Sequence, residues 1–303
     1  MLTSSSFRRP PPDTPYSDGL WAPELHALGG RWYVYFAAGH PAKGNPSHRM
    51  WVLGGPSAND DPTGQGWEFM GGIRGMPDHW AIDGTVFQLN GQWYTVWSGW
   101  PKGDDSDKMQ ELFIMSLSDP VTGSSEPVTI SRPEHKWEFS DGDHGVNEGP
   151  QFLEGPNGWK GIVYSCAGSW TKDYKLAVLH YKGGDPLNKS SWHKEKNCLV
   201  ENAGHNKEGP FGPGHCSFLP GQDGGEYICC FHATDKETDG WENRKCRAQR
   251  LVWTNDGPYM GGLVGNQTPD YNVFMSSQPP PGAAQPQKQH GLKGLMHKLK
   301  QEL

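Results

Sequence analysis

Short runs of alternating apolar and polar residues recur along the chain, and the clearest of them follow Gly-containing turns. Such alternation predicts β-strands, joined as hairpins where the turn is short. The pattern predicts strands over Arg31–Phe36, Gln92–Trp97, Leu112–Leu117, Ala177–Tyr181 and Arg247–Trp253. The last three are expected to be later strands of their units. Three or four strands in roughly 60 residues is the size of one propeller blade.

Four segments of the chain resemble one another, each with a polar loop, a short strand, a Gly-rich turn and a second apolar strand. They contain WAPELH, WAIDGT, NEGP and GPGHCS, and they align on Glu24, Asp83, Glu148 and His215. The steps between these four residues are 59, 65 and 67. A near-constant period predicts a repeat architecture. In a closed ring, equivalent residues of the repeats would converge on one axis.

The composition supports an all-β fold. Hydrophobic residues make up only 34% of the 303 residues, yet there are 14 Trp, 10 Tyr and 11 Phe, with 41 Gly and 26 Pro for turns. Burial therefore relies on aromatic rings, and a helical bundle is disfavoured. The net charge of −7 without a basic stripe argues against a nucleic-acid partner. Six cysteines without a CxxC motif are interpreted as free buried thiols.

Composition also divides the chain into four parts. Residues 1–19 form an irregular lead-in, 20–275 the β-propeller, 276–290 a Pro/Gln-rich linker and 291–303 a short basic amphipathic helix. For that helix we favour a solvated tail over contact with a membrane or a partner, because isolated helices of this length are marginal. No apolar run is long enough for a membrane span, and no apolar stretch follows the N-terminal arginines as in a secretory signal.

Two carboxylates at matching points of neighbouring blades suggest acid catalysis. Glycoside hydrolysis needs a protonated carboxyl that delivers a proton to the leaving oxygen and an ionised one that activates water. Glu148 lies in a Gly- and Pro-flanked turn that enters an apolar strand, and it suits the general acid. Asp83 would meet it on the axis, raise its pKa and orient it. The alternative for Glu148 is an ordinary surface residue in a turn.

The other aligned residues have weaker assignments. His215 is either a hydrogen-bonded structural residue or an axial residue bound to a cation or water. For Glu24 we favour a brace that holds its loop through backbone hydrogen bonds over contact with substrate. Trp21 and Trp80 would wall an axial pocket and stack on sugars, although core packing is the usual role of Trp.

The linked motifs WAPELHALGGRWYVYFAA, HWAIDGTVFQLNGQWYTVWSG, VNEGPQFLE and FGPGHCSF resemble successive blades of glycoside hydrolase family 43. The resemblance runs from about residue 15 to 274 and implies a five-bladed β-propeller, of the α-L-arabinofuranosidase or β-xylosidase type, that acts by inversion. It implies Glu148 as acid and Asp83 as pKa modulator. It also places His215 near a bound calcium ion or water, and suggests Arg247 as a substrate-binding residue. No other cofactor is implied.

The family's third acidic residue, the Asp base of its first blade, has no match here. Asp13 and Asp18 precede Trp21, but neither lies in a strand pattern or a full period upstream of Glu24. We therefore expect the first blade to be largely missing. A truncated sequence is favoured over a naturally shortened protein. Truncation would also explain the missing signal peptide, since the family is usually secreted; otherwise the protein would be cytoplasmic.

These patterns leave three functions open. The favoured one is hydrolysis of α-L-arabinofuranosyl, or else β-xylosyl, groups on hemicellulose or arabinan of plant cell walls, impaired if the base is absent. Loss of one proton transfer typically costs ~10²–10⁴-fold in rate. The second is a non-catalytic carbohydrate-binding propeller derived from the same family. A propeller scaffold for protein binding is disfavoured by the carboxylates and histidine at repeated positions.

Overall fold

The computed structural model describes residues 10–261 apart from 105, 108, 141, 203–208 and 222–225. This part of the chain is all-β, with strands joined by turns and four short 3-10 helices. The helices are η1 (Asn45–Ser47), η2 (Lys136–Glu138), η3 (Pro156–Gly158) and η4 (Lys189–Ser191). Among these residues no helix is long and apolar enough to cross a membrane.

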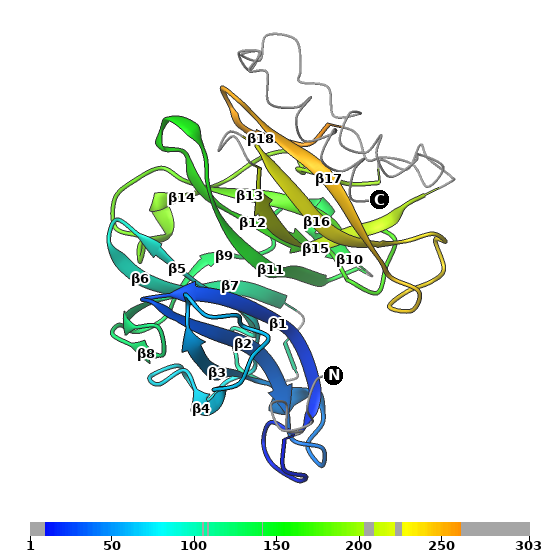
Figure 1. The fold of residues 1–303 in the computed structure, drawn as a ribbon. Helices are drawn as coiled ribbons and strands as arrows, with labels where there is room; N and C mark the ends of the chain where they lie inside the picture. The colour runs from blue at the N-terminus through cyan, green and yellow to red at the C-terminus, as the bar shows by residue number, and fades with distance from the viewer. Residues whose placement is uncertain are drawn as a thin grey trace, which may run out of the picture.

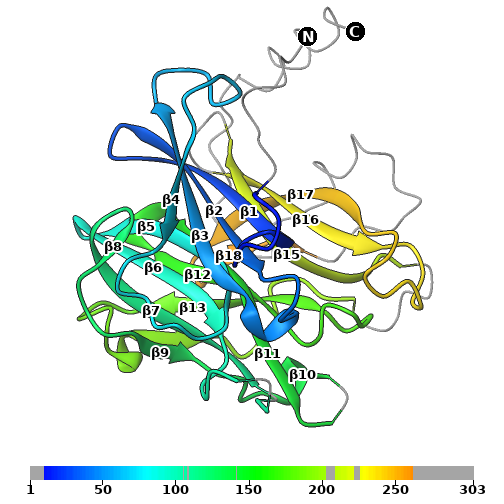
Figure 2. The ribbon, with the colours of Figure 1, turned by 90° about the horizontal axis from the view of Figure 1, so that it is seen from below.

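The strands form four blades, which we number I to IV in chain order, and Figures 1 and 2 show them following one another from blue to orange. Blade I contains β1 (Asp18–Leu28), β2 (Arg31–Gly39), β3 (Arg49–Ser57) and β4 (Glu68–Gly72). Blade II contains β5 (Ala81–Leu89), β6 (Gln92–Gly99), β7 (Met109–Asp119) and β9 (Val128–Ser131), with β8 (Thr122–Gly123) beside β7.

Blades III and IV complete the described sheets. Blade III contains β11 (His144–Glu154), β12 (Lys160–Cys166), β13 (Lys175–Tyr181) and β14 (Trp192–Lys194), with β10 (Phe139–Ser140) beside β11. Blade IV contains β15 (Phe211–Pro220), β16 (Tyr227–Thr234), β17 (Lys245–Thr254) and β18 (Gly257–Tyr259). A short parallel pairing of β11 with β7 joins blades II and III into one sheet.

Three apolar cores lie between successive blades. Tyr35 and Met115 belong to the core between blades I and II, and Val96 and Tyr164 to the core between II and III. The core between blades III and IV contains Leu176 and the thiols Cys216 and Cys229. All of the named residues are almost inaccessible to water. Large rings and aliphatic side chains thus stack the sheets face to face, as the aromatic composition predicts.

Each blade begins with a strand that carries a β-bulge, and the bulges define the true repeat. The register of pairing shifts between Trp21 and Glu24 in β1, Ile82 and Thr85 in β5, Glu148 and Gln151 in β11, and Gly214 and Ser217 in β15. Inside each shift, the residue that directly follows the first of the two named positions has a positive φ. These residues are Ala22 (45°), Asp83 (57°), Gly149 (55°) and His215 (49°). Bulges of this kind re-aim side chains at functional sites.

The bulges correct the alignment drawn from the sequence. Asp83 and His215 are structural equivalents, as expected. Relative to the position that these two occupy in their bulges, Glu148 lies one residue earlier and Glu24 lies two residues later. The equivalents of Glu24 include Gln151, and the equivalents of Glu148 include Gly214. Because a shift of one residue reverses the face that a strand residue occupies, the error matters for which side chains share a site.

The other sequence-based expectations of the fold agree with the structure. All five predicted strands occur, within β2, β6, β7, β13 and β17, and the last three are third strands of their blades. The β-propeller class is confirmed, with four blades in the described residues and no sheet of a fifth among them. The lead-in ends two residues early, because β1 starts at Asp18. Residues 262–275, the linker and the C-terminal helix lie outside the described residues.

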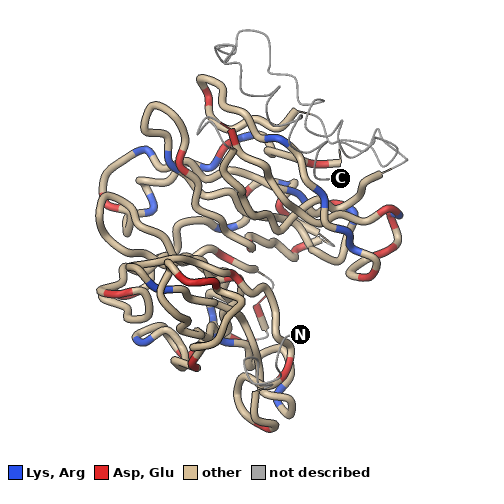
Figure 3. The backbone as a smooth tube through the Cα atoms, in the orientation of Figure 1, with Lys and Arg blue, Asp and Glu red and all other residues tan. Residues whose placement is uncertain are grey.

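The cysteines and the charges also agree with expectation in the described part of the chain. All six cysteines are free thiols, and three of them are buried, but Cys246 is exposed. Figure 3 shows acidic and basic residues interspersed along the backbone rather than gathered into one basic face.

Candidate active site

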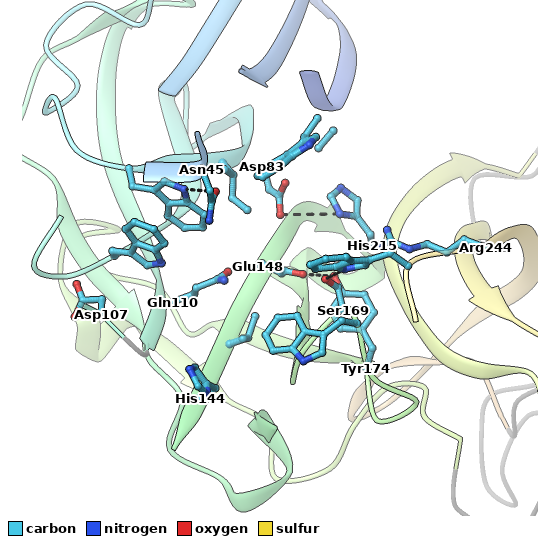
Figure 4. Close-up of a pocket in the computed structure, with 18 of the residues that line it drawn as sticks. Asn45, Asp83, Asp107, Gln110, His144, Glu148, Ser169, Tyr174, His215 and Arg244 are labelled. Carbon is cyan, nitrogen blue, oxygen red and sulfur yellow. Dashed lines mark hydrogen bonds and ion pairs between the residues drawn. The ribbon is translucent and has the colours of Figure 1, made fainter. Parts of the chain in front are cut away.

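The bulges of all four blades line one cavity of about 810 Å³. It is drawn in Figure 4, and the bulge residues that line it are Trp21, Ala22, Ile82, Asp83, Glu148 and His215. The remaining wall comes from loops and from neighbouring strand residues. A cavity of this size is typical of small-molecule sites and exceeds what one sugar unit needs. Convergence of the repeats on one site, predicted from the sequence, is therefore what the structure shows.

Asp83 and Glu148 lie together at the bottom of this cavity, and both are almost fully buried. The backbone N–H of Gly149, the residue after Glu148, donates to Oδ2 of Asp83 over 3.1 Å. Nδ1 of His215 lies 4.0 Å from the same oxygen, and Figure 4 shows His215 facing Asp83. The left-handed conformation of Asp83 is one that Asp tolerates better than most residues. The bulge thus turns a carboxylate inward.

Burial raises the pKa of both carboxyls, and the charge of Asp83 adds to the effect on Glu148. Desolvation, followed by the charge of Asp83, raises the pKa of Glu148 to about 8. Burial also raises the pKa of Asp83, against the opposing effects of His215 and the Gly149 N–H. A carboxyl that keeps its proton near neutral pH is what a general acid requires. The arrangement matches the roles predicted for both residues, which stay predictions.

We expect Asp83→Asn to lower the pKa of Glu148, because it removes the adjacent negative charge. The acid works in its protonated form, so activity is lost as pH rises through this pKa. The alkaline limb of kcat/KM, expected near pH 8 in the unaltered chain, should move to lower pH. Asp107→Asn is the matched control, since Asp107 also lines the cavity but is not among the charges acting on Glu148. An unmoved limb in Asp83→Asn would contradict the coupling.

The described side chains near His215 do not by themselves supply the ligands of a calcium ion. Calcium prefers six to eight oxygen ligands. Within the described residues no three His, Cys, Asp or Glu side chains gather to hold a metal ion, and Asp83 is the carboxylate that faces His215. An ion here would take most of its ligands from water. The axial calcium therefore stays a prediction, and no chemical step below depends on it.

The predicted aromatic walls are present, but they differ in accessibility. The indole of Trp21 is 41% exposed and stacks on His48 with ring centroids 3.7 Å apart. Trp80 is buried, stacks on Trp100 at 4.2 Å and donates to Asn45 Oδ1 over 3.1 Å. Trp21 is thus accessible to a ligand, whereas Trp80 is almost inaccessible and is held in place by its neighbours.

Arg247 lies outside the cavity lining and pairs with Asp235 at 2.6 Å. The arginine that lines the cavity is Arg244, three residues earlier, in the turn between β16 and β17. Its charge acts on both Asp83 and Glu148. A substrate-binding role for Arg247 stays a prediction, and the geometry favours Arg244.

Glu24 is a brace, although not through backbone hydrogen bonds. Its carboxylate contacts Nε2 of His26 at 2.8 Å and Nε2 of Gln151 in β11, and it does not line the cavity. Because Gln151 occupies the equivalent position after the bulge of blade III, the two repeats are joined by side chains at matching points. This contact fastens β1 to the strand that carries Glu148.

A buried polar network supports the strand of Glu148 from behind. The carboxylate of Glu138, fully buried, accepts hydrogen bonds from Asn147 Nδ2 (2.8 Å), Tyr164 Oη (3.0 Å) and Lys194 Nζ (2.6 Å). The backbone carbonyl of Asn147 accepts a further bond from Ser98 Oγ over 2.9 Å. The residue directly before Glu148 is thus held by blade II and by its own blade III.

Several cavity residues escaped the sequence analysis because they lie in loops, in η1 or at the first residues of β7 and β11, outside the repeat motifs. They are Asn45, Trp100, Asp107, Gln110, His144, Ser169, Trp170, Tyr174, Trp241 and Arg244. Trp241 is 59% exposed, donates to Ser169 Oγ over 3.0 Å and packs edge-on against Trp170. An exposed indole at a cavity wall suits stacking on a sugar ring. The signal for these two tryptophans would have been aromatic residues in Gly-rich loops.

The fold and the cavity together define a β-propeller with a buried carboxyl pair and aromatic walls on its axis. The model of the family "Glycosyl hydrolases family 43" matches residues 2–259. The chain belongs to this family, as the sequence motifs predicted.

Curated relatives and a solved structure agree with this assignment. The chain is 32% identical over 269 residues to α-L-arabinofuranosidase B of Pyricularia oryzae, covering 86% of this chain and 51% of that protein. It is 33% identical over 265 residues to an extracellular exo-α-(1→5)-L-arabinofuranosidase of Streptomyces avermitilis, covering 84% and 53%. The structure of α-L-arabinofuranosidase from Lactobacillus brevis matches with a TM-score of 0.75 and 29% identity, covering 87% and 82%. The chain thus spans about half the length of these two curated relatives.

Proposed function

We propose that the protein is a glycosidase that removes terminal α-L-arabinofuranosyl groups from an oligosaccharide or polysaccharide with inversion. One observation carries the proposal: Glu148, with a raised pKa, lies beside Asp83 in a cavity lined by aromatic rings. The arabinofuranosidases among its relatives support the choice of sugar. β-Xylosyl groups on hemicellulose are the alternative substrate, and arabinan or hemicellulose of plant cell walls is the proposed source.

In this mechanism Glu148 donates its proton to the glycosidic oxygen as the bond from that oxygen to C1 breaks. Water attacks C1 from the opposite face, which inverts the configuration, and gives up a proton. Asp83 keeps Glu148 protonated and accepts the Gly149 N–H, so that the bulge stays in place. Exclusion of water from the buried pair strengthens these electrostatic effects.

The base that receives the proton from water is not evident in the described cavity wall. Its carboxylates are Asp83, Glu148 and Asp107. Asp107 accepts the backbone N–H of Lys102 over 2.5 Å and lies 3.9 Å from its ammonium group, so it is already paired. This observation favours a second candidate function, a carbohydrate-binding propeller that does not turn over.

Activity on an aryl α-L-arabinofuranoside with and without azide separates the two functions. We expect slow release of the aryl group by the purified chain and at least a tenfold increase with azide, which needs no base. Azide attacks C1, the C1–O bond breaks, Glu148 protonates the leaving oxygen, and the product is the inverted glycosyl azide. Sugar binding without turnover in either condition would favour the binding propeller. Neither binding nor turnover would overturn the proposal.

Location follows from the relatives only as a proposal. The relative from Streptomyces avermitilis is described as extracellular, and we propose that this protein is secreted as well. Secretion would bring the enzyme into contact with cell-wall polysaccharide, which lies outside the cell that produces the enzyme.

A further inference from the structure

Tyr174 makes a direct contact with the proposed general acid. Its hydroxyl donates to Oε1 of Glu148 over 2.7 Å, and its side chain is almost completely buried. Tyr174 belongs to the loop between β12 and β13, immediately before β13, and it reaches the base of the cavity (Figure 4). No repeat motif of the sequence points to this residue, because no other blade places a tyrosine there.

Blade IV leaves space for the phenol ring. Gly214 is the structural equivalent of Glu148 in blade IV. A Cβ on Gly214 would lie 2.0 Å from Cε1 of Tyr174, so that any side chain there would displace the ring. On blade IV the imidazole of His232 stacks against Tyr174, with centroids 5.5 Å apart and planes 12° apart. The ring is therefore held in one orientation by its neighbours.

The groups around Tyr174 and Glu148 leave one carboxyl oxygen for chemistry. The backbone N–H of His215 donates to Ser165 Oγ over 2.7 Å, which ties β15 to β12 beside the site. The Tyr174 hydroxyl directs its proton to Oε1 of Glu148. In the described part of the chain no hydrogen bond reaches Oε2, although Glu148 lines the cavity. Oε1 is thus occupied and Oε2 is available to a substrate.

We propose that Tyr174 is a positioning residue for the leaving-group acid: its bond to Oε1 fixes the carboxyl of Glu148 so that Oε2 carries the transferable proton. The inference rests on the proposed function, because it assigns a positioning role to a residue of the same site. General acid catalysis depends on placing that proton within hydrogen-bond reach of the leaving oxygen. A neutral hydroxyl bonded to Oε1, on a ring held between Gly214 and His232, achieves this without adding a charge.

The test is Tyr174→Phe, assayed on aryl arabinofuranosides of graded leaving-group pKa. We expect kcat to fall about tenfold for poor leaving groups, which need the proton, and to change less than twofold for a dinitrophenyl group, which does not. KM should stay within twofold. The bond favours the ionised form of Glu148, so its loss should raise the pKa of Glu148 and move the alkaline limb to higher pH. Asp83 and Arg244, the other charges acting on Glu148, are unaltered.

The matched control is Tyr35→Phe, which also removes a buried hydroxyl, bonded to the carbonyl of Pro120 over 2.7 Å in the core of blades I and II. It should lower stability without changing the leaving-group dependence. An equal loss of kcat on all leaving groups, or a limb that does not move, would overturn the positioning role.

A second measurement keeps this inference separate from the proposed function. ¹³C-labelled glutamate carboxyls can be titrated by NMR in the full chain, with Glu148→Gln identifying the signal of Glu148. The pKa of that signal should be higher in Tyr174→Phe than in the unaltered chain, whether or not the chain turns over. An unchanged pKa contradicts the role of Tyr174, whereas absent turnover alone contradicts only the proposed function.

Discussion

Glu148→Gln is expected to lower kcat on an arabino-oligosaccharide by about 10²–10⁴-fold, the usual contribution of a general acid. Gln has nearly the same shape and can still accept the Tyr174 hydroxyl bond, so the buried site keeps its packing. What is lost is the transferable proton. Because a sugar leaving group departs as an unstable alkoxide without that proton, the loss should be largest on natural-type substrates. Steady-state kinetics with an oligosaccharide, whose leaving group needs the proton, and with a dinitrophenyl arabinofuranoside, whose leaving group does not, measures the two extremes.

The control for this variant lies on the same strand. Glu154→Gln changes a carboxylate at the outer end of β11 that is half exposed and pairs with Lys160 at 2.9 Å. It should leave kcat within twofold. Glu148→Gln should also abolish the alkaline limb near pH 8, since the group that titrates there is gone. Retention of more than a tenth of the activity on the oligosaccharide would show that another residue is the acid.

The strands and the repeat could be predicted from the sequence because their signals are local. Arg31–Phe36 and Gln92–Trp97 alternate clearly after Gly-containing turns, and both form the second strands of their blades, β2 and β6. Local alternation determines which face of a strand is buried. The period between WAPE, AIDG, NEGP and GPGH then orders the blades around the cavity. Asp83, Glu148 and His215 were found by this route.

The bulges show where sequence alignment of the repeats fails. Matching charged residues placed Glu24 with Asp83, but pairing across the strands places Ala22 with Asp83 and Glu24 with Gln151. A bulge adds a residue to one strand only, so the offset is visible in the hydrogen-bond register and not in the spacing of acidic residues. The side chain of Glu24 therefore lies outside the cavity and joins two blades.

The loop residues were missed for a different physical reason. Trp241 meets Ser169, 72 positions away in the sequence, and Tyr174 meets Glu148 across 26 positions. Such contacts depend on how whole blades stack, and no local pattern encodes them. Gly214 is part of a sequence motif, but only the structure shows why glycine is needed there. A Cβ at this position would lie 2.0 Å from the ring of Tyr174.

The network around Glu138 supplies the largest expected effect on stability. The ion pair of Glu138 with Lys194 spans 2.6 Å, with side chains 0% and 9% exposed. Burial lowers the pKa of Lys194 despite this partner, so desolvation is the dominant effect on the lysine. The pair is kept because each charge satisfies the other and because the carboxylate is fully bonded: Asn147 and Tyr164 also donate to Oε1, and the backbone N–H groups of Glu134 and His135 donate to Oε2. Removing one partner leaves the other charge buried and uncompensated.

We therefore expect Lys194→Met to lower the free energy of unfolding by about 3–5 kcal/mol, the usual cost of breaking a buried ion pair on one side. Met fills the space of the lysine stem, so the loss is electrostatic rather than a cavity. Urea unfolding followed by tryptophan fluorescence measures it. Lys189→Met is the matched control, because Lys189 pairs with Glu134 at 2.9 Å with both side chains about half exposed, and it should cost under about 1 kcal/mol.

The double variant Glu138→Gln/Lys194→Met tests the cause. If the uncompensated carboxylate is responsible, replacing it with a neutral amide should recover part of the loss, so that the double variant is more stable than Lys194→Met alone. Gln can still accept from Asn147 and Tyr164 through Oε1, but its amide nitrogen would face the N–H groups of Glu134 and His135, so only part of the loss is recovered. If the double variant is instead less stable than either single variant, the hydrogen bonds of the carboxylate outweigh its pairing with Lys194. In that case the strand before Glu148 is held chiefly by Asn147, and the loss in Lys194→Met has another origin.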